Sequence, residues 1–445
     1  MDTAITPTPP APTPPEQAQA SNRSALMIVF LVVFIDLLGF GIILPLLPRI
    51  AEAYVKVVFP NPAWLVGLIV GILMSLFSLM QFVFAPIWGR VSDRIGRRPI
   101  LLIGLFGSVV FYSLFGYAAS LPHQNAAAAT TAMLLFFIAR IGAGVAGATI
   151  STAQAVIADC TPPEKRKHGM ALIGAAFGIG FTFGPMIGYA CLHFAPDFPG
   201  IGQGLIGYTA AGLSLIALLL GLALLRETRV FNTESTGRRN WFDWSATRQA
   251  LVDPAIGPVI LTFFMASLGF GAFEVTLSLF LKDVFDLGER QSFLFFAYIG
   301  FALMLTQGLY RGMASRASEV TFMAIGIFFM ALGVGMQGAI CYAWWQSIAV
   351  DGLTPYLYIA LTAAVVGFSF LTPSAQALIS RRTSADRQGE ILGVNQSASA
   401  LARILGPILG VTLYKATDNH LWPFVAGAVL LLLMFPMLPR IKRGG

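Results

Sequence analysis

The sequence predicts an all-α membrane protein with twelve transmembrane helices arranged as two pseudo-symmetric six-helix bundles. Three observations lead to this prediction: an internal repeat, a hydrophobic composition, and twelve apolar segments of membrane-spanning length. Of the 445 residues, 56% are hydrophobic and 11% are charged, whereas soluble domains carry about 25% charged residues. A soluble protein of this size cannot bury so much apolar surface, so the lipid bilayer is the expected solvent.

The repeat relates residues 151–188 to residues 373–410 without a gap, at an offset of 222 residues. Ala153–Ile157 (AQAVI) corresponds to Ala375–Ile379 (AQALI). The correspondence continues through a Gly-Pro pair and a later glycine, which are Gly184, Pro185 and Gly188 in one half and Gly406, Pro407 and Gly410 in the other. An offset of half the chain indicates two homologous halves, as in membrane folds built from parallel repeats around a central path.

Hydropathy places the spans, each about 20 residues or more, as a hydrocarbon core of ~30 Å requires. The predicted spans are 25–48, 64–87, 99–120, 131–155, 169–191, 203–225, 255–281, 292–313, 319–342, 354–378, 389–413 and 421–439. The expected organisation is a disordered Pro-rich tail over 1–24, an N-terminal bundle over 25–225, a charged linker over 226–253, a C-terminal bundle over 254–440 and a short tail over 441–445.

The basic residues predict the orientation. Of the 28 Lys and Arg residues, 21 lie on the side shared by both predicted termini, five lie on the other side and two lie within spans. By the positive-inside rule both termini are cytoplasmic, in an inner or plasma membrane, with residues 1–24 and 441–445 as cytoplasmic tails. The net charge of +7 is therefore a topology signal, and no nucleic-acid partner is expected. Three cysteines without metal-ligand spacing predict no metal site.

A basic loop follows the second span and reads GRVSDRIGRRP. Its glycines permit a tight turn between helices, and its arginines hold the loop in the cytoplasm. Positive-inside anchoring alone explains the arginines, but it explains neither the aspartate nor both glycines. The loop residues singled out in this way are Gly89, Asp93, Arg94, Gly96, Arg97 and Arg98. At the repeat offset Ser315 replaces Asp93, so the second half has lost this carboxylate.

Charged and polar residues also fall inside spans. In the fourth span Arg140, Gly144, Gly147, Ser151 and Gln154 share one helix face. This stripe is either a close-packed helix interface or part of a functional site. An arginine within a span, which costs about 2.5–3.5 kcal/mol on insertion scales, favours the second.

Two carboxylates are predicted within the membrane: Asp36 midway along the first span, and Glu274 in the outer part of the seventh. Burial and neighbouring charges can bring a carboxylate into a range where it titrates near neutral pH, as a proton carrier must. The alternative is a structural ion pair with Arg140 or with Arg403 of the eleventh span. The two interpretations are compatible, because protonation can break an ion pair.

These motifs resemble those of the major facilitator superfamily, from residue 25 to the end of the chain. The GRVSDRIGRRP loop resembles its signature loop, in which the aspartate latches the two halves together on the cytoplasmic side. The resemblance implies that the six residues singled out above form a cytoplasmic gate, with a one-sided latch because Ser315 replaces the second carboxylate. The segment around Arg140 resembles its fourth-helix motif, whose arginine is tied to proton transfer. GFTFGPMIGY resembles the fifth-helix motif of its antiporters, which implies a helix-packing role for Gly180, Gly184, Pro185 and Gly188, and by the repeat for Gly406, Pro407 and Gly410. Tyr189 stands where that motif usually ends in a second glycine.

Within the superfamily, the chain looks most like the tetracycline-resistance branch of the drug:proton antiporters, and closest to the animal tetracycline-transporter-like proteins, which handle organic anions. The resemblance implies the major facilitator fold and proton-coupled efflux of small amphipathic compounds or drugs by alternating access, with Asp36, Glu274 and Arg140 in coupling. Four residues are expected to line the substrate cavity: Arg403, Gln154, Gln376 and Gln396.

Two other functions stay open at this stage. One is a proton-coupled or facilitative carrier of an organic anion or metabolite; the other is a non-transporting membrane receptor. No lysine follows a glycine, so there is no Walker A sequence, and neither an ATP-driven pump nor an enzyme is expected. The expected energy source is the proton gradient, with no cofactor. The expected partners are protons, a small-molecule substrate and the lipid bilayer, and the expected state is a monomer.

Overall fold

In the computed structural model, the described residues are 16–161, 166–197, 200–228, 244–349, 351–384 and 387–443, and these contain helices and no β-strand. The helices of the first half are α1 (Glu16–Ile43), α2 (Leu47–Val58), α3 (Ala63–Ile95), α4 (Arg97–Ser120), α5 (Ala126–Ala146), η1 (Gly147–Thr149), α6 (Ile150–Cys160), α7 (Arg166–Phe194), η3 (Ala195–Asp197) and α8 (Gly204–Leu224). Those of the second half are α9 (Trp244–Val252), α10 (Gly257–Asp283), α11 (Glu289–Met313), α12 (Glu319–Trp345), η4 (Asp351–Leu353), α13 (Thr354–Arg382), α14 (Gln388–Lys415), α15 (Trp422–Leu432), η5 (Phe435–Met437) and α16 (Leu438–Arg443).

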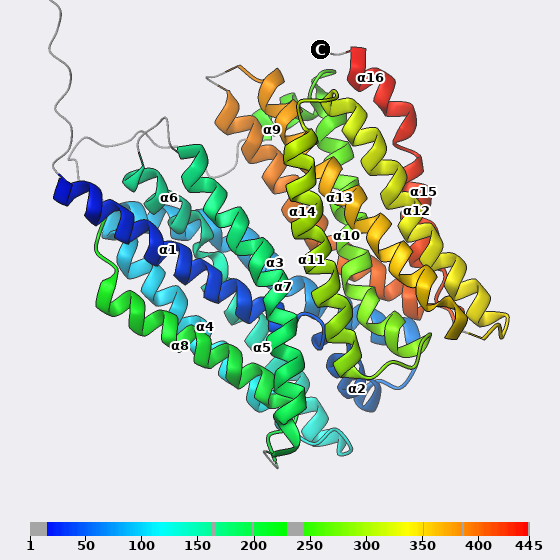
Figure 1. Cartoon of the computed structure of the whole chain (residues 1–445). Coiled ribbons are helices and arrows are strands. Elements are labelled where there is room, and N and C mark those ends of the chain that lie inside the picture. The colour runs from blue at the N-terminus through cyan, green and yellow to red at the C-terminus, as the bar shows by residue number, and fades with distance from the viewer. Residues whose placement is uncertain are drawn as a thin grey trace, which may run out of the picture.

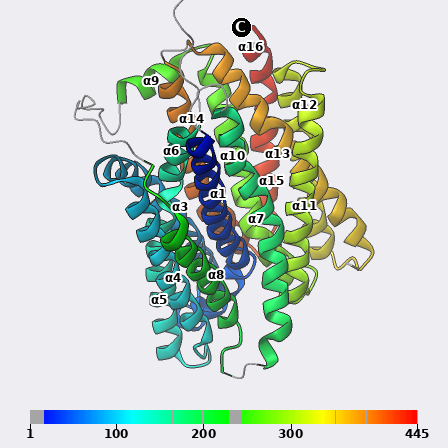
Figure 2. The same ribbon diagram turned by 60° about the vertical axis from the view of Figure 1, so that its left-hand side comes forward.

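The two halves form two helical bundles that lean apart toward the end carrying the C-terminus and meet around α2 at the other end (Figure 1). These are called the C-terminal end and the distal end below. Turned by 60°, the same arrangement shows α1 and α8 lying across the front of the first bundle (Figure 2). Among the described residues, ten helices are long and apolar enough to cross a membrane, or eleven if α1 and α2 count as one bent span. A further long helix, α7, lies at the place of the predicted fifth span.

Three predicted spans are interrupted in the structure: the first, the fourth and the twelfth. In the twelfth, the 3₁₀ turn η5 separates α15 from α16. The first was expected to run to residue 48, but α1 ends at Ile43 and α2 starts at Leu47 after a bend of 46°. Pro45 and Pro48 account for this bend, because proline cannot donate a helical hydrogen bond and is tolerated only in the first turn. In the fourth span the 3₁₀ turn η1 separates α5 from α6 at Gly147.

The predicted repeat is visible in how the helices pair. In the first half α7 packs along α1, and in the second half α14 packs along α10. Across the bundles, α3 packs against α14, and α7 packs against α11. In each cross-bundle pair, the second span of one half packs against the fifth span of the other half. This is the arrangement expected of two equivalent halves.

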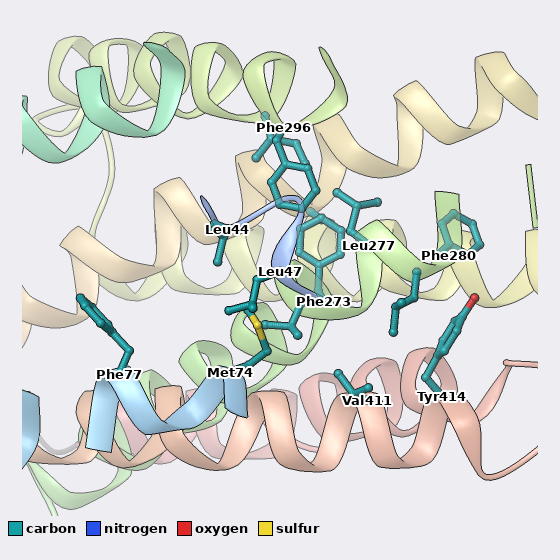
Figure 3. Close-up of a cluster of buried hydrophobic side chains, with 14 of the residues drawn as sticks. Leu44, Leu47, Met74, Phe77, Phe273, Leu277, Phe280, Phe296, Val411 and Tyr414 are labelled. Atoms are coloured by element: carbon teal, nitrogen blue, oxygen red, sulfur yellow. The ribbon is translucent and has the colours of Figure 1, made fainter. Parts of the chain in front are cut away.

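The main hydrophobic cluster crosses the interface between the bundles rather than filling each bundle separately. Figure 3 shows Leu44, Leu47, Met74 and Phe77 of the first half facing side chains of the second half. The second-half members drawn there are Phe273, Leu277, Phe280, Phe296, Val411 and Tyr414. This shared core covers the distal part of the interface, where the two bundles meet.

Candidate functional site

The polar stripe of the fourth span packs along α3. Gly147 accepts a hydrogen bond at its carbonyl from Gln81 Nε2 (3.1 Å), and Ser151 Oγ donates to the Ala85 carbonyl (3.0 Å). A Cβ at Gly144 would lie 2.7 Å from the Phe77 carbonyl oxygen, so only glycine permits this approach. The helix-packing interpretation therefore applies to most of the stripe.

Arg140, at the distal end of that stripe, is held by a backbone carbonyl and two aromatic rings. Its side chain is buried, and Nη2 donates to the Met74 carbonyl (3.3 Å). The guanidinium carbon lies 4.8 Å from the ring centre of Phe77 and 6.0 Å from that of Phe40. Desolvated cation–π contacts of this kind contribute about 2 kcal/mol. The aromatic partners of Arg140 could not be read from the sequence, because they lie on other helices.

Glu274 and Arg403 are brought together by the packing of α14 on α10. Arg403 is the charged group that acts electrostatically on Glu274, and Arg403 Nη1 also donates to Ser399 Oγ one turn away (3.2 Å). By solvent-accessible area Glu274 is partly exposed and Arg403 is exposed. Asp36 lies in α1, but its side chain is outside the described residues.

The three glutamines expected in the cavity lie on α6, α13 and α14, and all three are exposed. Gln396 shares a face of α14 with Arg403, because seven residues are two helical turns. Gln154 and Gln376 occupy equivalent places in the two repeats. Their assignment to a substrate cavity stays a prediction.

The gate loop is organised around Arg97. This guanidinium pairs with Asp93 one turn before it (2.6 Å) and with Asp159 at the end of α6 (3.3 Å). Gly96 adopts φ +108°, a conformation that favours glycine. Glu227, just after α8, accepts hydrogen bonds from the backbone N–H groups of Arg97 (2.8 Å) and Arg98 (3.1 Å) and so caps α4. Glu227 was not identified from the sequence.

The glycines of the fifth-helix motif and its repeat lie at close helix crossings. A Cβ at Gly184 would meet the Gly41 backbone of α1 at 2.8 Å, and a Cβ at Gly406 would meet the Leu268 carbonyl oxygen of α10 at 2.9 Å. Gly180 faces Leu37 in the same way, and Gly410 faces Ala272. Pro185 and Pro407 lie inside α7 and α14. Gly188 instead contacts Phe293 of the other bundle.

The bundles approach closely at the distal end. On α3, Ser75 Oγ donates to the Ile404 carbonyl of α14 (2.5 Å), and a Cβ at Gly71 would lie 2.8 Å from the Ile408 Cα. On α10, Ser278 Oγ donates to the Pro45 carbonyl (2.6 Å). The gate-loop pairs Asp93–Arg97 and Arg97–Asp159, at the opposite end, each join residues of one bundle. The distal end is therefore closed by direct contacts between the bundles.

A cluster of charges at the distal end was not predicted at all. Glu52 of α2 is buried, and it forms ion pairs with Lys282 of α10 and Lys415 of α14. From the sequence these are isolated charges that flank three different spans.

A multi-pass helical chain with two repeated bundles, close glycine crossings between them and charges within its spans has the architecture of a secondary transporter. The Major Facilitator Superfamily profile matches residues 29–350, and the chain belongs to this superfamily. It is 29% identical over 415 residues to the class E tetracycline resistance protein of Escherichia coli, covering 92% of this chain and 93% of that protein. It is 28% identical over 468 residues to major facilitator superfamily domain-containing protein 10 of Homo sapiens, covering 97% and 96%.

Solved structures agree on the fold. The human organic anion transporter MFSD10 (TETRAN) aligns with a TM-score of 0.63 at 24% identity, covering 94% of this chain and 99% of that one. A D-xylose–proton symporter aligns with a TM-score of 0.71 at 16% identity, covering 95% and 99%. The predictions of a major facilitator fold, of a multi-pass membrane protein and of a transporter rather than an enzyme are confirmed.

Proposed function

We propose that this transporter exports small amphipathic organic compounds in exchange for protons, by alternating access between two six-helix bundles. The observation that carries the proposal is the partly exposed Glu274 carboxylate opposite Arg403, on neighbouring helices within the membrane. A carboxylate that gains a proton loses its attraction for a guanidinium, so protonation and the packing of α10 on α14 are coupled. The full-length similarity to tetracycline resistance proteins supports the same reaction class.

Asp36 is the proposed principal proton carrier, because a midspan carboxylate can be exposed alternately to the two sides. Glu274 lies closer to the distal end of its helix and shares the task or contacts the substrate. Arg140, Arg403, Gln154, Gln376 and Gln396 complete the proposed coupling groups and substrate path. The charge asymmetry of the loops supports a cytoplasmic location for the C-terminal end, and the closed distal end would then face away from the cytoplasm.

A carrier of organic anions is the second candidate. Arg403 favours it, because an exposed guanidinium within a span can attract an anionic group. The relative named as an organic anion transporter supports the same possibility.

The test is flux of a drug and organic-anion panel in proteoliposomes, with and without an imposed pH gradient. Asp36→Asn and Glu274→Gln are compared with Asp418→Asn, which changes an exposed carboxylate in the loop after α14. We expect gradient-driven flux to disappear in Asp36→Asn while equilibrium binding survives, and Asp418→Asn to behave as the unchanged protein.

Other outcomes reassign the roles. Flux that survives in Asp36→Asn but is lost in Glu274→Gln would make Glu274 the principal carrier. Gradient-driven flux that persists in both variants would contradict proton coupling through these carboxylates and favour the anion carrier.

A further inference from the structure

The distal cluster is centred on Glu52, a carboxylate with no solvent exposure on the short helix α2. It pairs with three lysines: Lys415 of α14 at 2.5 Å, Lys56 of its own helix at 2.8 Å and Lys282 of α10 at 2.9 Å. Two of these three ion pairs cross from the first bundle to the second. Glu52 is therefore the first bundle's carboxylate in a charge cluster that also contains Lys56 of its own helix and Lys282 and Lys415 of the second bundle.

The second bundle holds its lysines in place around that carboxylate. Asp283 pairs with Lys415 (2.6 Å), and the Lys415 ammonium lies 5.3 Å from the ring centre of Tyr414. Lys415 is thus fixed by two carboxylates, one from each bundle. His420 Nε2 lies 3.9 Å from Asp283, and its ring stacks on that of Tyr414.

Neighbouring polar contacts cross the same boundary. Arg49, one turn before Glu52, donates to Ser292 Oγ (2.8 Å) and to the Leu287 carbonyl. Gln203 of the first bundle donates to Glu289 of the second (2.6 Å). The distal contact between the bundles therefore consists of hydrogen bonds and ion pairs as well as hydrophobic packing.

Electrostatics gives Glu52 a specific role in this set. A buried carboxylate is tolerated only with charged partners, and removing one partner of a buried pair is strongly destabilising. When the bundles separate at the distal end, Lys282 and Lys415 move away with the second bundle, and Glu52 retains only Lys56. The closed distal state is thus the state in which Glu52 is neutralised.

We propose that Glu52, through Lys282 and Lys415, is an electrostatic latch that holds the distal side of the transporter closed and sets the balance between its two access states. The latch is distinct from the basic gate loop, which lies at the opposite end. Its role in turnover rests on the proposed alternating access, whereas its effect on conformation requires neither a substrate nor a proton gradient.

The test measures distances between spin labels in purified protein without substrate, in a background whose native cysteines are replaced. One label pair, Gln124→Cys with Asp418→Cys, lies on exposed distal loops of the two bundles. The other, Leu224→Cys with Met313→Cys, lies on exposed helix ends at the C-terminal end. Glu52→Gln should lengthen the distal distance and shorten the other, with the ratio of the two states changed roughly tenfold or more.

Lys56→Gln is the matched control, because it removes a half-exposed lysine that pairs with Glu52 from the same helix. It should leave both distances unchanged, and Glu52→Asp, which keeps the charge, should stay near the unchanged protein. Lys282→Gln removes a half-exposed cross-bundle lysine and should shift both distances in the direction of Glu52→Gln, even if the latter folds poorly. Unchanged distances in Glu52→Gln and Lys282→Gln, or an equal shift in Lys56→Gln, would overturn the latch.

Failure of the latch and failure of the proposed transport reaction are separable. Distances that respond to Glu52 while no pH-gradient-driven flux is found would retain the latch and reject proton coupling. Normal gradient-driven flux together with distances that do not respond to Glu52 would retain proton coupling and reject the latch.

Discussion

A single methyl group at Gly71 is expected to open the distal end of the transporter. In the closed structure a Cβ at this position would lie 2.8 Å from both the Ile408 Cα and the Pro407 carbonyl oxygen. This is about 0.7 Å or more below the optimal separation of non-bonded carbon atoms. Both neighbours are backbone atoms and cannot rotate away, so α3 and α14 must separate.

Overpacking of a closed interface costs about 1–3 kcal/mol. A state in which the bundles have parted does not bear this cost. At about 1.36 kcal/mol per factor of ten, Gly71→Ala should therefore raise the ratio of distally open to closed protein by roughly five- to 150-fold.

The assay is the rate at which a membrane-impermeant maleimide labels a single reporter cysteine. Thr412→Cys is a suitable reporter, because Thr412 lies on α14 where α3 approaches and its hydroxyl oxygen is buried. Ser278→Cys, on α10 facing Pro45, is an independent second reporter. Gly212→Ala on α8 is the matched control, because a Cβ there meets no neighbouring atom.

Labelling of both reporters should accelerate in Gly71→Ala and remain unchanged in Gly212→Ala. Equal rates in the two variants would refute the argument that close backbone contact limits opening. An acceleration confined to Thr412→Cys would reduce the effect to local repacking around Gly71.

Three further predictions concern other parts of the molecule. Asp93→Asn removes one carboxylate from Arg97 in the gate loop and should weaken closure of the cytoplasmic side, so turnover in proteoliposomes should fall while expression is maintained. Unchanged turnover would exclude Asp93 from this closure. Gly184→Leu places a large side chain against the Gly41 backbone, so the thermal midpoint in detergent should drop by several degrees, and an unchanged midpoint would contradict the close crossing of α1 and α7. Burial lowers the pKa of His420 in the loop after α14, so the unfolded chain binds more protons and stability should fall as the pH drops below the ordinary value of about 6.5. His420→Gln should flatten that dependence in melting curves at pH 8 and pH 5.5, and identical slopes would exclude His420 as its source.

From the sequence, a helix-packing role of the repeated glycines could be predicted, but the groups that close the distal end could not. Gly184 and Gly406 lie at equivalent places in the repeat, and both prove to sit at a close crossing with the first helix of their own half. Such positions can be predicted from the sequence, because a glycine in an apolar membrane helix indicates that another helix backbone approaches closely there.

The Glu52 cluster could not be predicted in this way. Glu52, Lys282 and Lys415 lie near the ends of three different helices, and each alone has the pattern of a charge that anchors a span in the interface. Their proximity depends on how the two bundles pack together, and the periodicity of a single helix does not predict that packing. The aromatic contacts of Arg140 could not be predicted either, because they also join residues of different helices.

The break between α1 and α2 could have been predicted in part. Pro45 and Pro48 indicate a break in the helix, but the first span was placed by hydropathy alone and therefore ran past Pro45 to Pro48. The bend turns α2 into a separate amphipathic segment, and that segment carries Arg49 and Glu52 to the second bundle.

The Ser75 hydroxyl has two acceptors within reach, and this affects the cost of parting the bundles. It lies 2.5 Å from the Ile404 carbonyl oxygen of α14 and 2.9 Å from the Gly71 carbonyl oxygen of its own helix. When α14 moves away, the proton can turn wholly to Gly71, so no donor is stranded in an apolar environment. Ser292 differs, because it accepts from Arg49 across the interface while its own proton goes to the Gly288 carbonyl of α11. Hydroxyls with a second partner one turn back let an interface bind firmly and still release without leaving an unmade hydrogen bond behind.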